Sequence, residues 1–253
     1  MEVIGTGFLA GSLRRISERH EGVVALAAGV SDIAGADPVR DFRREARLVA
    51  GTAAQCKRQG RTLLFFSTAS ASLYGAPGCT GTEECEHPAT TPYGRHKRAM
   101  ERIVREAGCD WLILRLSHVV GPDQAPHQLV PALTRQILGG RVRVYRGACR
   151  DLLDVRDFLA ATDSLLAAGA AGEVVNVASG VPVPVEDMVT HIGALLGREP
   201  EREYVRRDHG HRVSVRKLDR MLGRAPGTAP AASYRDVLDR YVPGYAPRAA
   251  PGA

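Results

Sequence analysis

The sequence predicts an α/β fold in which helices cover both faces of a parallel sheet. Apolar strand-like segments alternate with helix-like segments along most of the chain. The first strand runs into a glycine-rich turn and then a helix, which is how a doubly wound sheet begins. A length of 253 residues, with 44% hydrophobic and 5% aromatic residues, fits one such domain with a smaller additional part.

The individual elements follow from apolar runs and from the proline and glycine residues at their ends. Predicted strands cover residues 3–4, 23–29, 62–66, 111–116, 142–145 and 173–177. Predicted helices cover about 8–20, 38–59, 93–107, 128–138, 155–168, 184–196 and 232–241, and a loop is expected at 75–92. This order divides the chain into a sheet region at 1–145, a mixed part at 146–242 whose strand near 173–177 rejoins the sheet, and a disordered tail at 243–253.

The glycine-rich turn is Gly5-Thr6-Gly7-Phe8-Leu9-Ala10, a G-x-G-x-x-A form between a strand and a helix. Glycines allow a tight turn and let backbone N–H groups approach a pyrophosphate at the helix N-terminus. The turn is therefore expected to bind a dinucleotide through Gly5, Gly7, Phe8 and Leu9, as in a Rossmann-like sheet.

A second motif, Pro92-Tyr93-Gly94-Arg95-His96-Lys97, opens a predicted helix. Spacing of four places Tyr93 and Lys97 on one helix face, where the ammonium favours the phenolate. Such a tyrosine exchanges a proton near pH 7. A hydroxyl at the strand end Ser67-Thr68-Ala69-Ser70 is placed to hydrogen-bond a substrate oxygen. Together these groups suit the interconversion of a carbonyl and an alcohol.

Composition excludes several other classes of protein. The net charge of +6 comes almost entirely from arginine, as expected of a solvated surface with a few arginines facing an anionic substrate, and no nucleic-acid-binding motif accompanies it. No apolar run reaches about 18 residues and no leader is visible, so we expect a cytoplasmic protein without a membrane span. The five cysteines show no C-x-x-C pair, so reduced thiols and no metal site are expected.

These motifs, taken in order, resemble the extended short-chain dehydrogenase/reductase family of nucleotide-sugar epimerases, dehydratases and ketoreductases, over roughly residues 1–242. Besides the glycine turn and P-Y-G-x-x-K, the similar segments are Ala27-Ala28 at a strand end, Ser70 before Leu73-Tyr74-Gly75, Leu114-Arg115-Leu116-Ser117-His118-Val119-Val120-Gly121-Pro122, Arg150-Asp151-Leu152-Leu153-Asp154-Val155 and Asn176-Val177-Ala178-Ser179-Gly180.

The resemblance implies roles for single residues. Tyr93 would be the catalytic acid/base, and Lys97 would bond the nicotinamide ribose and lower the pKa of Tyr93. Ser70 would hydrogen-bond the reacting oxygen, with Thr68 as the substitute. The remaining candidates are the cofactor contacts Ala27 and Ala28, and the substrate contacts His118, Gln124, Arg150 and Arg207, or Arg206 in place of Arg207.

Simpler roles compete with some of these assignments. Ser70 would also serve as a strand-end cap, and Arg150 would also pair with Asp151 or Asp154. His118 would also be an ordinary polar loop residue. His209 and His211 are expected to be solvated.

Two departures from the family pattern carry information. Where the family's 4,6-dehydratases have Asp-Glu, this chain has Ala71 and Ser72, so dehydration is not expected. The segment 23–29 follows the first helix almost directly and is interpreted as the family's fourth strand. Strands two and three are then missing. The acidic ribose-binding residue, which normally lies about 20 positions after the glycine turn, is missing as well. Asp32 would take that role if 23–29 were instead strand two.

The missing strands affect both assembly and cofactor choice. An unpaired first strand leads us to expect another segment or a second subunit, as in a homodimer, against residues 2–5. Without a carboxylate to repel a 2′-phosphate, and with Arg14 and Arg15 near the turn, the sequence favours NADP(H), with NAD(H) as the alternative.

The expected function is NAD(P)H-dependent reduction of a nucleotide-activated 4-keto-6-deoxy sugar, dTDP-linked by preference. The alternatives are an NAD-dependent nucleotide-sugar epimerase, which needs the same residues, and a non-catalytic cofactor-binding regulator, which would not need Tyr93 and Lys97.

Overall fold

The computed structural model describes residues 1–30, 37–206, 210–225, 228 and 230–246. Its centre is a five-stranded sheet in the order β1-β2-β3-β4-β8, with every neighbouring pair parallel. The strands are β1 (Glu2–Ile4), β2 (Val23–Leu26), β3 (Thr62–Thr68), β4 (Trp111–Leu116) and β8 (Glu173–Val177). The predicted parallel sheet is confirmed, and the strand at 173–177 rejoins it beside β4.

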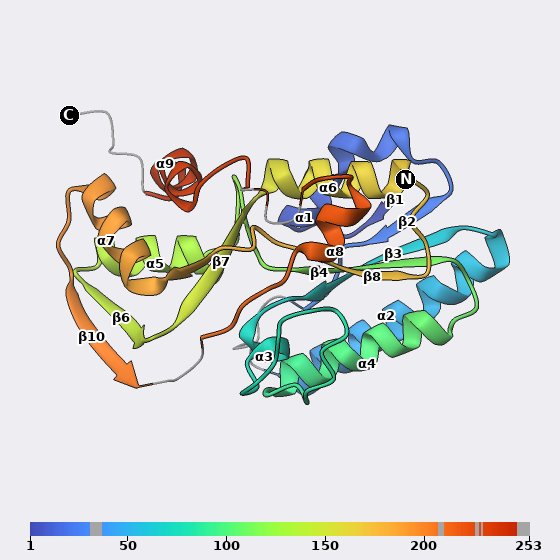
Figure 1. Ribbon diagram of the computed structural model, residues 1–253, viewed down its shortest axis with the longest axis horizontal. Helices are drawn as coiled ribbons and strands as arrows, with labels where there is room; N and C mark the ends of the chain where they lie inside the picture. The colour runs from blue at the N-terminus through green and yellow to red at the C-terminus, as the bar shows by residue number, and fades with distance from the viewer. Residues whose placement is uncertain (31–36, 207–209, 226–227, 229, 247–253) are drawn as a thin grey trace.

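Helices cover both faces of this sheet (Figure 1). One face carries α1 (Phe8–Leu13), the 3₁₀ turn η1 (Arg14–Arg19) and α6 (Val155–Ala167), and the other carries α2 (Pro38–Gln59) and α4 (Pro92–Glu106). Successive side chains of β2 point to the two helical layers in turn. Val23 and Ala25 pack in the apolar cluster with α1 and α6, whereas Val24 and Leu26 pack in the cluster with α2 and α4. The sheet is therefore buried on both sides, as all-parallel sheets are.

The two long helices have clear sequence signals at their ends. Asp37 accepts a hydrogen bond from the Arg40 N–H at the start of α2, and Pro38 follows in the first turn. Gly60 ends α2 with a left-handed φ of 62°. Thr91 caps α4 by accepting from the Gly94 N–H, with Pro92 in its first turn. These signals explain why the sequence predicted both helices within about one residue.

The position of β2 agrees with the interpretation that two strands are missing. It lies between β1 and β3, where the order 3-2-1-4-5-6 of a doubly wound sheet places its fourth strand. The connections β1-α1-β2 and β2-α2-β3 both move in the same direction across the sheet, but α1 and α2 lie on opposite faces of it. The two crossover connections therefore have opposite handedness. Since parallel crossovers are right-handed in about 98% of cases, one of these two connections is an exception to that rule. Among the described residues, no strand pairs with the outer edge of β1.

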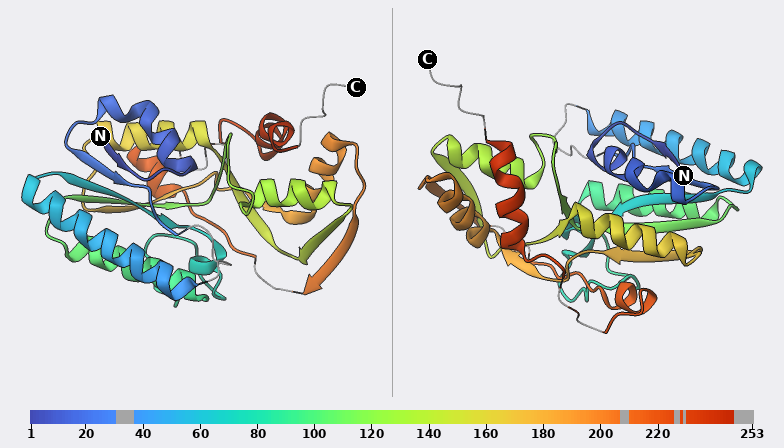
Figure 2. Two further views of the ribbon diagram at one scale, coloured as in Figure 1. Left: turned by 180° about the vertical axis from the view of Figure 1, so that it is seen from behind. Right: turned by 90° about the horizontal axis from the view of Figure 1, so that it is seen from above.

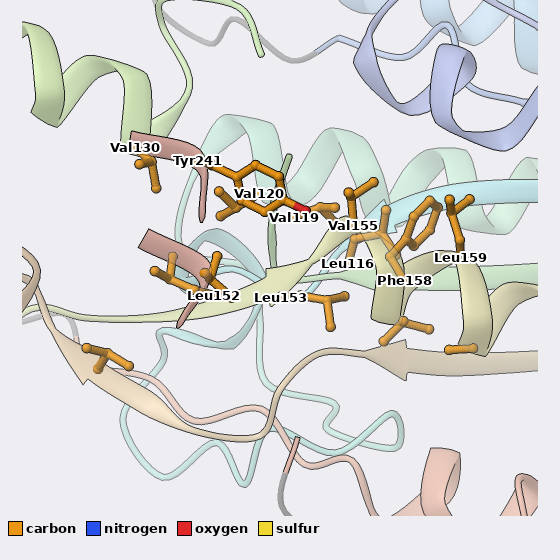
Figure 3. Close-up of a cluster of buried hydrophobic side chains, with 14 of the residues drawn as sticks. Leu116, Val119, Val120, Val130, Leu152, Leu153, Val155, Phe158, Leu159 and Tyr241 are labelled. Carbon is orange, nitrogen blue, oxygen red and sulfur yellow. The ribbon is translucent and has the colours of Figure 1, made fainter. Parts of the chain in front are cut away.

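A smaller lobe follows β4 in the chain (Figures 1 and 2). It contains a three-stranded sheet in the order β5-β7-β9, a parallel pair β10-β6, and the helices α5, α7 and α9. Their bounds are β5 (His118–Val120), α5 (Leu129–Leu138), β6 (Arg141–Arg146), β7 (Cys149–Asp154), β9 (Pro182–Pro184), α7 (Val185–Leu196), β10 (Glu201–Arg206) and α9 (Tyr234–Tyr245). Side chains of β5, β7, α6 and α9 meet in one apolar cluster that joins this lobe to the main sheet (Figure 3).

Some local expectations need correction. The elements α3 (Ala71–Tyr74), β5, β7, β9, β10 and α8 (Arg216–Met221) were not predicted. Most of them are short, and the six-residue strands β7 and β10 are rich in charged residues. The expected disordered tail is wrong at its start, because α9 continues to Tyr245, whose hydroxyl donates to Gln124 Oε1 at 2.9 Å. Residues 247–253 lie outside the described residues. Within the described part of the chain, no helix has the length and apolar character needed to cross a membrane.

The expectation of five reduced thiols is also wrong. Cys79 and Cys85 form a disulfide within the loop between α3 and α4, whereas Cys56, Cys109 and Cys149 are free. Sequence spacing alone does not show that the loop turns back on itself. Turns held by the Cys79 N–H to Ala76 O and the Cys85 N–H to Thr82 O bonds bring the two thiols together.

Candidate active site

The glycine turn lies against the end of β2, as a dinucleotide site requires. Gly5 has a φ of +134°, and a Cβ at this position would lie 2.5 Å from the Ala27 carbonyl oxygen. The Ala27 N–H donates to Ile4 O at 2.8 Å, which joins the two strand ends. Only glycine fits where Gly5 stands. The structure thus brings Gly5, Ala27 and Ala28 together at the carboxyl edge of the sheet.

The start of α1 holds the remaining predicted cofactor contacts. Gly7 is the N-cap residue of α1, and half-buried Phe8 and Leu9 form its first turn. Phe8 packs so closely on Gly121 that a Cβ there would lie 2.7 Å from its ring. Arg14 turns back over the loop, where Nη2 donates to Gly5 O at 2.7 Å. This arrangement places an exposed guanidinium beside the turn.

Tyr93 and Lys97 occupy one face of α4, as the spacing predicted. Lys97 Nζ lies 5.8 Å from the centre of the Tyr93 ring. The ammonium is buried, with Nζ 2.7 Å from Glu45 Oε1 and 3.4 Å from Phe66 O. Burial alone would lower the pKa of Lys97, but the facing Tyr93 and Glu45 outweigh burial and raise it.

The expected lowering of the Tyr93 pKa does not appear as a net effect. Burial raises the pKa of Tyr93, and the negative charge of Glu45 raises it further. Lys97 acts in the predicted direction, since its ammonium lowers the pKa, but it does not outweigh the other two. Tyr93 is accordingly a protonated phenol at neutral pH in this structure.

The loop from Thr68 to Ser72, which we call the hydroxyl loop, faces the start of α4. Buried Thr68 donates to Ser70 Oγ at 2.9 Å, and Ser70 caps α3 by accepting from the Ser72 N–H. Ser70 is therefore a helix cap, the simpler role considered for it, with its side chain still partly exposed. The Thr90 N–H donates to Ser72 O at 3.1 Å, which packs the turn before α4 against α3. Ser70 and Tyr93 are thereby brought to the same edge of the sheet.

Two histidines and an arginine gather beyond this edge. Burial, the Arg150 charge and His211 lower the pKa of His118 to about 3. Burial and the Arg150 charge likewise lower the pKa of His211 to about 4, although its hydrogen bond to the Ala69 backbone opposes them. Ala69 lies between Thr68 and Ser70, so this neutral pair with a neighbouring guanidinium borders the hydroxyl loop.

Other substrate candidates have separate outcomes. His211 is buried, with 7% of its surface exposed, so the expectation that it is solvated is wrong. Asp151 accepts from the Ser179 and Gly180 N–H groups, and Asp154 from the Arg156 N–H and the Tyr241 hydroxyl. These bonds give both carboxylates partners other than Arg150.

Gln124 Nε2 donates to Val119 O at 2.8 Å. Arg207, His209 and Asp32 lie outside the described residues, as does the Arg206 side chain.

Sequence reasoning missed three residues near the site: Glu45, His96 and His211. The carboxylate of Glu45 receives Lys97 Nζ and His96 Nε2, the latter at 2.9 Å. A signal was present, because Glu45 lies on the same face of α2 as the buried residues Val49, Thr52 and Cys56. A charged residue on the buried face of an amphipathic helix indicates a buried partner.

Comparison with known proteins decides the family. A model of the NAD dependent epimerase/dehydratase family matches residues 10–178. The chain belongs to this family. Membership in the epimerase/dehydratase family confirms the resemblance drawn from the motifs and agrees with the Rossmann-like fold class.

Individual relatives of the epimerase/dehydratase family are distant. A dTDP-glucose 4,6-dehydratase of Xanthomonas campestris pv. campestris is 28% identical over 201 residues, covering 70% of this chain and 57% of that protein. The matched region is little more than half the length of that dehydratase and of a glycan biosynthesis protein of Haloferax volcanii, and a smaller share of some other curated relatives. The structure of RMD from Pseudomonas aeruginosa complexed with NADPH superposes with a TM-score of 0.80 at 22% identity, covering 96% of this chain and 97% of that one. A dTDP-glucose 4,6-dehydratase from Bacillus anthracis in complex with NAD has a TM-score of 0.75 at 24% identity, with 95% and 78% covered.

Proposed function

We propose that this chain reduces a nucleotide-activated 4-keto-6-deoxy sugar with NADPH or NADH. The observation that carries the proposal is the loop from Thr68 to Ser72 beside Tyr93. This loop offers hydroxyl groups, and Ala71 and Ser72 stand where the family resemblance implies Asp-Glu in a 4,6-dehydratase. A site with a protonated tyrosine and no carboxyl pair in this loop suits carbonyl reduction better than elimination of water.

The chain's own groups account for the proton side of the reaction. A nicotinamide cofactor held at the glycine turn of Gly5 and Gly7 would supply the hydride for the carbonyl carbon. Tyr93 donates its phenolic proton to the carbonyl oxygen, and its raised pKa keeps that proton in place at neutral pH. Ser70 donates a hydrogen bond to the same oxygen, so that the negative charge developing there is stabilised.

The residues at the glycine turn fit a dinucleotide. Gly5 packs directly on the Ala27 carbonyl, and nothing lies within 4 Å of the Cβ position of Gly7 at the N-terminus of α1, so a pyrophosphate can approach the backbone there. Arg14 beside the turn favours a 2′-phosphate, and hence NADP(H). The RMD structure was solved with NADPH and the Bacillus anthracis dehydratase with NAD, so known relatives of this fold bind both cofactors.

The far side of the site suits the nucleotide diphosphate of the substrate. Arg150 supplies positive charge there, and the neutral imidazoles of His118 and His211 offer hydrogen bonds without a second charge. The dehydratases among the relatives act on dTDP-glucose, as their names state, which supports a dTDP-linked sugar.

A nicotinamide absorbance assay tests the proposal. The purified chain is mixed with dTDP-4-keto-6-deoxyglucose and with NADPH or NADH in turn. We expect oxidation of one cofactor in proportion to sugar consumed, and a rate about 10²- to 10⁴-fold lower for Tyr93→Phe. The control Tyr204→Phe, on the exposed strand β10, keeps the rate. If neither cofactor is oxidised and NAD is retained through purification, the result would instead indicate an epimerase. If the chain binds cofactor but turns over no sugar, the result would indicate a non-catalytic regulator.

A further inference from the structure

The carboxylate of Glu45 is a buried charged group in direct contact with the proposed catalytic pair. It has three donors: Lys97 Nζ at 2.7 Å, His96 Nε2 at 2.9 Å and the Val30 N–H at 3.1 Å. The side chains of Glu45 and Lys97 are 2% and 4% exposed. The donors hold the pKa of Glu45 at about 2 against the opposing effect of burial, so the carboxylate is ionised at every working pH.

Helix packing alone does not explain this ion pair. The α2–α4 interface already contains Val49, Ala53, Met100 and Val104, all nearly or fully buried. Replacing a buried ion pair with apolar residues of similar size is often neutral or stabilising. The charge pair sits instead at the end of the interface nearest the site, on the lysine four residues after Tyr93. Its place points to a role in the chemistry.

The pair is also enclosed by close backbone contact. A Cβ at Gly29 would lie 2.8 Å from Glu45 Oε1 and 3.0 Å from Lys97 Nζ. The ring of His96 is fixed in turn by stacking on Phe42, with ring centres 4.1 Å apart. The Lys97 ammonium therefore has one well-defined position, set by residues of α2, α4 and the segment after β2.

We propose that Glu45 is a positioning residue, which keeps the buried Lys97 ammonium charged and fixed beside Tyr93 without itself touching substrate or cofactor. The inference rests on the proposed function, because it assigns Glu45 to the Tyr93–Lys97 pair. A bare ammonium in this buried position would lose its proton readily, and the phenol beside it would lose its electrostatic partner.

The titratable groups around the pair come from two helices. Helix α4 contributes Tyr93, His96 and Glu101, and α2 contributes Glu45. Among the described residues, β3 and the segment after β2 contribute Phe66 O, the Val30 N–H and the Phe65 ring, whose centre lies 5.4 Å from Lys97 Nζ, and none of these groups titrates. Removing the charge of Glu45 makes the surroundings of Tyr93 and Lys97 more positive. The coupled pair then releases its first proton at a lower pH, whichever of the two groups releases it.

The test compares pH–rate profiles for sugar reduction by the wild type, Glu45→Gln and Asp41→Asn. Reduction needs the protonated pair, so its rate falls at high pH. In Glu45→Gln we expect this basic limb to move about one pH unit or more toward neutrality. Asp41→Asn removes a negative charge from the same helix at an ion-paired surface position, 35% exposed, and should leave the limb in place. An unshifted limb in Glu45→Gln, even with lower thermal stability, would overturn the proposal and leave the proposed function standing.

A second variant and a second measurement cover the remaining cases. Gly29→Ala keeps the carboxylate of Glu45 but displaces it from Lys97, so we expect the basic limb of the pH–rate profile to move in the same direction by a smaller amount. This variant keeps the test available if Glu45→Gln does not fold. If the wild type reduces no sugar, the proposed function fails, and titration of tyrosinate absorbance decides the role of Glu45. A tyrosine that ionises earlier in Glu45→Gln, but not in Glu45→Gln combined with Tyr93→Phe, supports the coupling. Unchanged tyrosinate titration in Glu45→Gln refutes it.

Discussion

His118 and His211 show how one guanidinium shapes a site by excluding further charge. Both imidazoles lie near Arg150 in surroundings that burial has already made unfavourable for a cation. Their lowered pKa values leave them neutral throughout the physiological range. Arg150 then remains the positive charge of this cluster, which suits recognition of a diphosphate by one strong cation and neutral hydrogen-bonding groups.

The lowered pKa of His211 predicts acid sensitivity of the fold. An unfolded histidine titrates near pH 6.5, so between about pH 6.5 and 4 the unfolded chain binds a proton that folded His211 does not. Stability therefore falls as the pH drops through this window, by about 2 kcal/mol at pH 5 from His211 alone. Urea unfolding at pH 7 and pH 5 should show a smaller loss for His211→Gln than for the wild type. Equal losses in both proteins would contradict the burial of this imidazole in a neutral form.

At the scale of elements, a buried network fixes helix α4 on the sheet. Arg115 of β4 donates to both carboxylate oxygens of Glu101 at 2.8 and 2.7 Å, and to the Tyr74 hydroxyl at 2.8 Å. That hydroxyl donates in turn to Asn176 Oδ1 of β8 at 2.7 Å. The network ties α3, α4, β4 and β8 together directly beneath the hydroxyl loop.

Glu101 offers a matched pair of substitutions, because two arginines contact it. Arg115→Met leaves a buried carboxylate without its main partner, and should cost about 3–5 kcal/mol of unfolding free energy. Arg105 contacts the same carboxylate from the surface, with 44% of its side chain exposed, so Arg105→Met should cost under about 1 kcal/mol. Denaturant unfolding at pH 7 measures both. Comparable costs would show that the buried network does not hold α4.

The elements that sequence predicted are those specified locally. Tyr93 and Lys97 share a helix face through a spacing of four, and capping residues mark α2 and α4, so these features required no tertiary information. Glu45 was missed because its partner Lys97 lies 52 positions away, and the contact exists only once α2 packs on α4. His211 lies in a polar segment that resembles a solvated loop, and the Ser214 N–H to Gly81 O bond helps to hold that segment against the α3–α4 loop.

On the scale of the whole molecule, the shortened sheet leaves β1 as an edge strand. Parallel strands direct the N–H and C=O of alternate residues to opposite neighbours. Ile4 O accepts from the Ala27 N–H on the β2 side, so the backbone groups of Val3 point outward. An edge of this kind favours pairing with another chain. Among the described residues no strand fills this place, and we expect either a second copy of the chain or another segment to pair there.

Proline at position 3 tests the first of these, a second copy of the chain. Val3→Pro removes an outward N–H while the inward hydrogen bonds of β1 remain, and proline is tolerated on edge strands for this reason. We expect the wild type to sediment as a dimer and Val3→Pro as a monomer, with nearly unchanged circular dichroism. Ile4→Pro is the matched control, because it removes an inward donor and should lower the melting temperature as well. A wild type that sediments as a monomer at micromolar concentration would show that no second copy pairs with β1, and a Val3→Pro dimer would place the subunit contact elsewhere.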